Sequence, residues 1–333
     1  MEKIKISIPK YTYEILTKDC ELFEILKTDG TLNKNEFLNT LIKNYYQEFT
    51  ATNTELKSAI SKSLSKYHSF DEFDQNDLSN DIISIINKFN NKYYDNKDTI
   101  TISVKPTRST TRIFTYIQDN IIQNQSISSF YRDLFNSYVS LVQTKRERII
   151  FKETVDTINE AIESNRQVYF HTAKSKNAIT ASVYCIANSK EELFNYVLTE
   201  SKGKITSYRL SRIKDIALVN EVRTIEKSNK EIYDKLIDYG PQYIISNKEE
   251  KVKIQLTPEG EKLYQKIYLY RPKYIEKDGN IYTFDCSYNQ ILFYFARLGK
   301  EAVILEPKTL RTKMRFAHKD AYVAYTDNNK KHD

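Results

Sequence analysis

Residues 195–219 read NYVLTESKGKITSYRLSRIKDIALV, two runs rich in β-branched and aromatic residues on either side of the turn at 201–204. Runs rich in Val, Ile, Thr and Tyr on either side of a Gly-containing turn predict a pair of strands. Further short runs precede them at 166–173 (RQVYFHTA) and 179–187 (ITASVYCIA), with turns expected at 174–177 and 189–192. One helix over 154–165 followed by four or five short strands predicts a small β-barrel.

The strands resemble the WYL domain, an Sm-like barrel of bacterial regulators. NYVL at 195–198 stands at the tripeptide that names the family, and SYRLSRIKDI at 207–216 stands at its closing Arg-x-x-Arg-Ile strand. The resemblance covers about 152–222, so we place this domain at 151–222. It implies sensing of nucleic acid or a nucleotide-like ligand through Arg209 and Arg212, because guanidinium groups bind phosphate bidentately and stack on bases.

His171 and Tyr196 are the expected neighbours of these arginines, for stacking or hydrogen bonding. Two plainer interpretations remain open at this stage. Both arginines can form salt bridges with acidic residues of the same barrel, and His171 can be an ordinary half-buried histidine.

The segment 223–333 resembles the small α+β extension that often follows WYL barrels. We expect a helix at 229–238, strands at 252–256 and 268–270, the segment IYTFDCS at 281–287 leading into a helix at 289–299 ended by Gly299, and a strand at 303–305. In such proteins the extension commonly supports dimerisation, so a homodimer is expected. Its basic side chains form either a ligand-facing cluster or a solvated face; they are Arg297, Lys308, Arg311, Lys313 and Arg315.

The first 150 residues contain a repeat. IKISIP at 4–9 and ITISVKP at 100–106 both alternate with period two, which predicts half-buried strands. Each is followed by a helical pattern, over 15–26 (broken at 28–30) and 108–122. A second, capped helix then begins at Thr31 or Asn33 in the first copy and at Ser126 or Ser128 in the second. Two further helices, over 55–67 and 78–93 with an acidic turn at 69–77, form a spacer at 51–97.

A lone strand with two amphipathic helices needs a second strand, and antiparallel pairing of the two copies supplies it. This arrangement resembles the ribbon-helix-helix family, over about 1–49 and 98–145, in which a two-stranded ribbon enters the DNA major groove. The resemblance implies that the start of each second helix (33–35 and 128–129) holds phosphates. The plainer alternative is a structural or dimerising platform. The side chains that would face bases are Lys3, Lys5, Ser7, Thr101, Ser103 and Lys105.

The composition is ordinary for a soluble globular protein of 333 residues, with net charge +7. The patterns and resemblances above predict a multi-domain α+β fold. The basic excess lies in 99–150 (seven basic, three acidic, net +4) and 223–333 (21 basic, 16 acidic, net +5), which suits a polyanion or simple solvation. Three cysteines and four histidines are too scattered to predict a metal site or disulfides. Without a signal peptide or an apolar span, we expect a cytoplasmic protein without membrane contact.

We expect no enzymatic activity and no cofactor, because the sequence has no phosphate-binding loop, GxGxxG, HExxH or GxSxG motif. The first hypothesis is a transcriptional regulator that reads duplex DNA with its ribbon and senses a ligand with its WYL domain. The alternative rests on similarity to the WYL accessory proteins of type VI-D CRISPR systems, and it implies that the WYL domain binds single-stranded RNA and modulates an RNA-targeting effector nuclease. A third possibility is a purely structural interaction protein.

Overall fold

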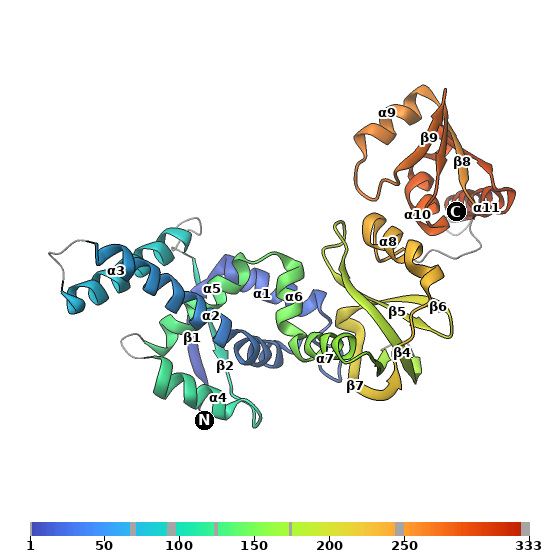
Figure 1. Ribbon diagram of the computed structural model, residues 1–333. Helices are drawn as coiled ribbons and strands as arrows, with labels where there is room; N and C mark the ends of the chain where they lie inside the picture. Colours follow the sequence, from blue (N-terminus) through green and yellow to red (C-terminus); the bar gives the residue numbers. More distant parts are fainter. Residues whose placement is uncertain are drawn as a thin grey trace. The chain divides into compact units, whose positions relative to one another are not determined.

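The structure is a computed structural model that describes residues 2–66, 71–91, 98–122, 126–172, 175–243 and 250–327. The chain divides into two compact units, 1–155 and 156–333, and each is described by itself (Figure 1). Both are mixed α+β, with three antiparallel sheets among the described residues. No helix in the described part of the chain has the length and apolar character needed to cross a membrane.

The first unit is built on a two-stranded ribbon. β1 (Ile4–Pro9) pairs antiparallel with β2 (Thr99–Val104), so the two repeats meet within one chain (Figure 1). Ile6 pairs with Ile102, its own equivalent in the repeat, which places a local twofold axis between these two residues. The helices of the unit are α1 (Lys10–Leu22), α2 (Lys34–Leu64), α3 (Glu72–Asn91), α4 (Thr111–Tyr116), a π-helical turn (Ile117–Ile121), α5 (Ile127–Ser140) and α6 (Gln143–Ile150).

Two helix boundaries in this unit differ from the sequence-based prediction. α1 ends at Leu22, before the predicted break, because Glu24 takes a left-handed φ of 57°. α2 continues to Leu64 instead of ending before a separate spacer helix. No Gly or Pro interrupts it, and Thr50, Thr52 and Thr54 donate to carbonyl oxygens four residues earlier in the helix. The spacer is therefore largely an extension of α2 followed by α3. The predicted spacer positions at 67, 69–70 and 92–93 lie outside the described residues.

The second unit begins with α7 (Lys152–Glu163), which straddles the boundary of the units, and a five-stranded sheet. The strands are β3 (Arg166–Thr172), β4 (Ser175–Asn188), β5 (Asn195–Ser201), β6 (Lys204–Arg209) and β7 (Ile213–Val222). Their order is β6-β5-β4-β3-β7. The β5–β6 turn has positive φ at Lys202 and Gly203, which suits a tight hairpin. Of the first predicted turn, at 174–177, residue 174 lies outside the described residues, and 175–177 belong to β4 instead of a turn.

The sheet is strongly curled, but it is not the closed barrel that we expected. Phe170 of β3 packs against Tyr208 of β6 with ring centroids 5.1 Å apart, although two strands separate them in the sheet. Within the described segments no pairing joins β6 to β7. A 3-10 turn (Leu210–Arg212) with fully buried Leu210 and Ser211 instead carries the chain from one edge to the other.

The remaining part of the second unit is a four-stranded sheet in the order β11-β8-β10-β9, covered by helices. The predicted strand at 268–270 is wrong. The strand lies at 274–278, after Pro272, which cannot donate to a sheet. Two helices, α9 and α11, were not predicted. The elements are α8 (Lys230–Tyr239), β8 (Val252–Leu256), α9 (Pro258–Lys266), β9 (Tyr274–Asp278), β10 (Ile281–Phe284), α10 (Tyr288–Phe295), β11 (Ala302–Glu306) and α11 (Lys308–Asp327).

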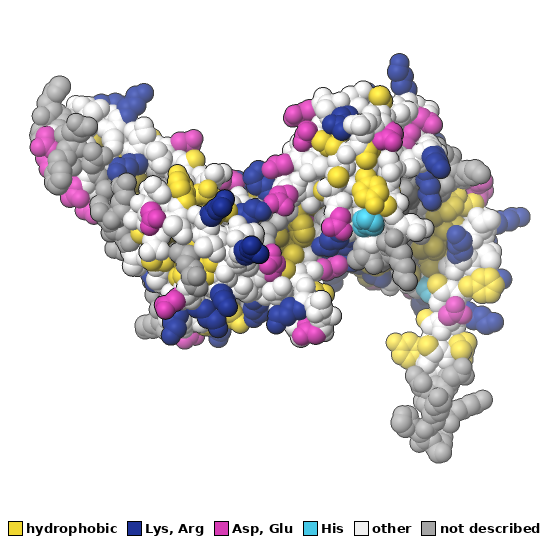
Figure 2. Space-filling model, turned by 90° about the horizontal axis from the view of Figure 1, so that it is seen from below, with side chains coloured by type: hydrophobic (Ala, Val, Ile, Leu, Met, Phe, Trp, Pro, Cys, Tyr) yellow, Lys and Arg dark blue, Asp and Glu magenta, His cyan; other side chains and the backbone are white. Residues whose placement is uncertain are grey.

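The last helix packs only with its first half. Leu310 and Met314 of α11 are buried in the core of this part, whereas residues 315–326 are all exposed. Phe316, Tyr322 and Tyr325 are 50%, 69% and 83% exposed, and Figure 2 shows hydrophobic side chains standing out along the projecting helix. Exposed aromatic residues in such number usually mark a contact surface.

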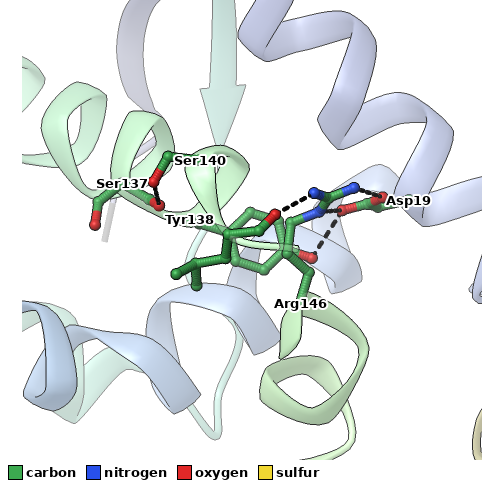
Figure 3. A network of polar contacts seen from close by, with 6 residues as sticks. Asp19, Ser137, Tyr138, Ser140 and Arg146 are labelled. Carbon is green, nitrogen blue, oxygen red and sulfur yellow. Dashed lines mark hydrogen bonds and ion pairs between the residues drawn. The ribbon is translucent and has the colours of Figure 1, made fainter. Parts of the chain in front are cut away.

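A buried ion pair ties the helices of the first unit together (Figure 3). Asp19 of α1 is inaccessible and accepts from Arg146 of α6 through both oxygens, at 2.7 and 3.0 Å. Tyr138 of α5 donates to the same carboxylate at 3.0 Å. Because a buried charge needs full hydrogen bonding, this triad fixes three helices relative to one another.

Candidate nucleic-acid interface

The six polar residues predicted for the ribbon lie on one face of it. Lys5 stands opposite Ser103 and Ser7 stands opposite Thr101, while Lys3 and Lys105 flank the ribbon at one end. All six are exposed except Ser7, which is half buried. Figure 2 shows Lys and Arg side chains close together on one side of this unit. The structure therefore assembles this set, whereas the role of these residues stays a prediction.

The outer edge of β1 is held by α5, which belongs to the other repeat. The backbone N–H of Ser7 donates to Ser128 Oγ at 3.4 Å, and Arg132 Nε donates to the carbonyl of Ser7 at 2.7 Å. Ser128 and Arg132 are one helical turn apart, so both reach the same strand residue. α5 itself begins at the cap Ser126, whose hydroxyl accepts from the N–H of Ser129.

The end of β2 is held in the same way by α2 of the first repeat. Asn35 accepts from the N–H of Lys105 at 2.9 Å and donates to its carbonyl at 3.1 Å. Asn39, one turn later and 1% exposed, donates to the same carbonyl and accepts from the N–H of Thr107. Each repeat's second helix thus secures the other repeat's strand. The side chains of Asn35 and Ser128 make these contacts. Phosphate binding by the backbone N–H groups at the same helix starts stays a prediction.

In the second unit, Tyr196 and Arg209 face each other across β5 and β6. The guanidinium carbon of Arg209 lies 3.3 Å from the centre of the Phe194 ring, so the guanidinium stacks on a ring that is 9% exposed. The hydroxyl of Tyr196 donates to Glu192 in the turn before β5. With Arg212 these residues form what we call the Arg209 cluster: Glu192, Phe194, Tyr196, Arg209 and Arg212.

Burial keeps the hydroxyl of Tyr196 neutral. Burial raises the pKa of Tyr196 far above its ordinary value, and the Glu192 carboxylate raises it further, while Arg209 and Arg212 oppose the shift. Tyr196 therefore remains a hydrogen-bond donor at physiological pH. Arg212 lies on the 3-10 turn, where its charge acts on Tyr196. The structure therefore brings three of the four predicted residues together, and their role stays a prediction.

His171 is not part of this group. Its ring lies against Tyr169, 5.3 Å between centroids, and its Nδ1 is 3.8 Å from Asp215 of β7. Because Phe170 and Tyr208 point toward each other, the alternation of a strand directs His171 and Arg209 away from that contact. Within the described segments, no group of three His, Cys, Asp or Glu residues is placed to hold a metal ion.

Sequence reasoning missed Phe194 and Glu192. The signal for Phe194 was available, because it is two residues before Tyr196 and period two places both on one face of an extended segment. Nothing in the sequence connected Glu192 with Tyr196, since that contact depends on how the turn at 189–194 folds. The backbone N–H of Ser189 donates to the carbonyl of Phe194 and closes this turn.

No family model matches the chain, and no curated protein matches it. Among solved structures, it is similar to the crystal structure of a CRISPR Cas-related protein, with a TM-score of 0.72 and 20% identity over 98% of this chain and 95% of that one. A second match is proteasome accessory factor B/C (PafBC) of Arthrobacter aurescens, with a TM-score of 0.28 and 15% identity over 70% of this chain and 39% of that one. The first likeness shows a shared fold over nearly the whole chain.

Proposed function

We propose that this protein is a regulator associated with a CRISPR system, and that its Arg209 cluster binds single-stranded RNA. It acts by binding rather than by catalysis, and its partner is an effector nuclease that targets RNA. This was the second hypothesis from the sequence. It now ranks first because the arrangement around Arg209 suits unpaired bases.

The observation that carries the proposal is the stack of Arg209 on Phe194 beside Tyr196. An arginine held flat on a ring loses little further side-chain freedom when it binds, and its planar fork suits phosphate oxygens. Arg209 is half buried, so the residue is not wholly closed off from solvent. Bases stack on aromatic and guanidinium planes without strict sequence preference, which is the mode used by many proteins that bind single strands.

The association with a CRISPR system is proposed from the structural likeness. The similar protein is described as CRISPR Cas-related, and the two chains align over almost their full lengths. At 20% identity a shared fold does not carry a shared activity with it. The proposal that the chain modulates an effector therefore needs its own test, by adding the protein to an effector nuclease and measuring RNA cleavage.

The binding test is a salt titration with single-stranded RNA, single-stranded DNA and duplex DNA. We expect tight single-strand binding by the wild type and a loss of tenfold or more in Arg209→Ala. The slope of log affinity against log salt should fall by about 0.7 for every phosphate of a single strand that the variant no longer neutralises. Arg209→Lys should retain the slope but lose affinity, because lysine keeps the charge without the planar stack.

The matched control is Lys204→Ala, an exposed cation at the other end of the same strand, β6. We expect it to change neither the affinity nor the slope by more than a small factor. If Arg209→Ala and Lys204→Ala behave alike, Arg209 is a structural residue and the proposed function is wrong.

A second function, duplex DNA binding, is favoured by the polar face of the ribbon. Lys3, Lys5 and Lys105 are exposed on it together with Thr101 and Ser103. A two-stranded ribbon fits the major groove, and lysines on it can contact bases or phosphates. The ribbon is complete within one chain, so this function would need no partner subunit to form the reading element.

This function is tested with Lys3→Ala combined with Lys5→Ala. The double variant should abolish duplex binding and leave single-strand binding unchanged. Lys62→Ala combined with Lys66→Ala removes two exposed lysines near the far end of α2 and serves as the charge-matched control. Equal duplex affinity of both double variants would leave the ribbon as a structural platform.

A further inference from the structure

The second unit contains a pocket of about 120 Å³ that no function above uses. Its walls come from the turn after β4, the C-terminal end of α8, and the segment around 271–273 together with the first turn of α10. An apolar cavity of about 150 Å³ can hold benzene, so a volume of this order suits one aromatic ring. The pocket is polar, however, and its polar groups indicate what kind of ring it suits.

Two amide oxygens at the pocket lack partners. Gln290, on the first turn of α10, is 2% exposed, and its Oε1 has no hydrogen-bond partner among the described residues. Oε1 of Gln242 also lacks a hydrogen-bond partner among the described residues, while Nε2 of Gln242 donates to Glu191 at 3.2 Å. A buried acceptor without a donor costs about 1–3 kcal/mol. A ligand with N–H groups would recover that free energy.

The position of Gln242 is fixed by the backbone before it. α8 ends at Gly240, whose φ of 135° lies in a region that side-chain-bearing residues rarely adopt. The Gln242 amide lies directly over this glycine, and a Cβ there would be 2.8 Å from Nε2. The absence of a side chain at 240 therefore allows Gln242 to lie where it lines the pocket.

The cations of the pocket favour an anionic group on the same ligand. Lys190 and Lys273 line it and are exposed. Arg271 is already engaged, since its guanidinium donates to the carbonyls of Tyr264 and Gln265. Glu191, which follows Lys190 in sequence, also lines the pocket, and burial raises its pKa above the ordinary value. Inorganic phosphate alone would pair with the lysines. At neutral pH, however, it has few O–H groups that could donate hydrogen bonds to the two amide oxygens.

We propose that this pocket binds one nucleotide, with N–H groups of the base donating to Gln290 and Gln242 and the phosphate lying against Lys190 and Lys273. The nucleotide belongs either to a bound RNA strand, in which case this inference rests on the proposed function, or to a free nucleotide. The Arg209 cluster adjoins the pocket through one turn, because Glu191 lines the pocket and Glu192 accepts from Tyr196. One strand could therefore contact both.

The test is isothermal titration calorimetry of the full chain with each of the four nucleoside 5′-monophosphates. We expect at least one to bind, and Gln290→Met to weaken it tenfold or more without lowering the melting temperature, because methionine fills the site without leaving a buried acceptor. Gln242→Leu, at a half-exposed position, is the second variant and should weaken binding in the same direction. Lys190→Ala with Lys273→Ala should weaken binding and remove its salt dependence.

Lys300→Ala is the control and should leave mononucleotide binding intact, because Lys300 does not line the pocket. Displacement of a labelled RNA oligonucleotide by the mononucleotide would assign the pocket to the RNA strand, and simultaneous binding would assign it to a free nucleotide. Absence of binding at millimolar concentration, or binding that Gln290→Met leaves unchanged, overturns the proposal. RNA binding that depends on Arg209 without any mononucleotide binding would overturn the pocket alone and leave the proposed function standing.

Discussion

The carboxyl group of Asp133 lies on α5, next in sequence to the arginine that holds β1. Burial raises the pKa of Asp133 to about 6, and the neighbouring charge of Arg132 only partly opposes this. An aspartate in an unfolded chain has a pKa of about 3.9. Between these two values the folded protein binds more protons than the unfolded one, so stability falls as pH rises through about 6.

Asp133→Asn removes this titration and should therefore stabilise the protein only where Asp133 is charged. We expect the variant to exceed the wild type by about 1–2 kcal/mol at pH 7.5 and to show no such gain near pH 4. Urea unfolding at both pH values measures the two differences. Asp119→Asn, at an exposed position, is the control and should change the unfolding free energy by less than about 0.5 kcal/mol. An equal effect of Asp133→Asn at both pH values would contradict the assignment.

The buried triad of Asp19, Tyr138 and Arg146 makes a second prediction at this scale. Arg146→Met leaves a buried carboxylate without its cation, which should cost about 3–5 kcal/mol of unfolding free energy. Tyr138→Phe removes one of three hydrogen bonds to the carboxylate and should cost about 1–2 kcal/mol. Lys145→Met is the matched control, because its ion pair with Glu48 is exposed and such pairs contribute about 0–1 kcal/mol. Equal losses of unfolding free energy in Arg146→Met and Lys145→Met would show that the buried triad stabilises the protein no more than an exposed ion pair does.

At the scale of elements, the alternation of apolar and polar residues with period two was the strongest sequence signal for a strand. The predicted strand at 4–9 and the ITISV part of 100–106 correspond to β1 and β2, and their antiparallel pairing was expected because neither can be stable alone. Helix ends were less predictable. The end of α1 depends on the left-handed residue Glu24, which has no periodic signature. α2 continues to Leu64 through a stretch without Gly or Pro, and apolar periodicity alone does not mark such a continuation.

The candidate sites also differ in how far the sequence predicts them. The ribbon face could be predicted because alternation alone places Lys5 and Ser7 on one side. The Arg209 cluster was partly predictable, since cross-strand pairing joins Tyr196 to Arg209. The pocket at Gln290 could not be predicted, because it is lined by segments from 188 to 290 that lie far apart in sequence and meet only through tertiary packing.

Each repeat's second helix holds the strand of the other repeat. This arrangement predicts which helix residue contributes most to the stability of the ribbon. Asn39 is buried, donates to Lys105, and accepts from Thr107 and Thr110. Asn39→Ala leaves these groups without their hydrogen-bond partner, so we expect a loss of about 2–4 kcal/mol in unfolding free energy. Gln47→Ala, at an exposed position of the same helix, should change it by less than about 0.5 kcal/mol. Urea denaturation compares them, and a small effect of Asn39→Ala would show that α2 does not secure β2.

At the scale of the whole molecule, the tandem repeat makes ribbon formation independent of oligomerisation. In a ribbon formed by two chains, the two would be coupled. Because β1 and β2 belong to one chain, the ribbon forms at any protein concentration. An oligomer is therefore free to form through another surface. The projecting half of α11 is the best candidate for that surface, because its aromatic side chains are exposed along three turns of helix.

We expect a homodimer through this helix, which places two ribbons and two Arg209 clusters in one particle. A stable interface buries about 800 Å² on each partner, and a projecting aromatic helix paired with its symmetry mate can contribute a large part of that area. Tyr322→Asp with Tyr325→Asp puts charges into the contact and should give a monomer mass at micromolar concentration in sedimentation equilibrium. Lys313→Asp with Lys319→Asp, on the same helix, adds as many carboxylates without removing aromatic area, so it should leave the dimer intact. Since the ribbon is complete in each chain, the monomeric variant should unfold at the wild-type urea concentration in its first unit. A wild-type monomer, or a dimer that survives the tyrosine substitutions, would place the contact elsewhere or remove it.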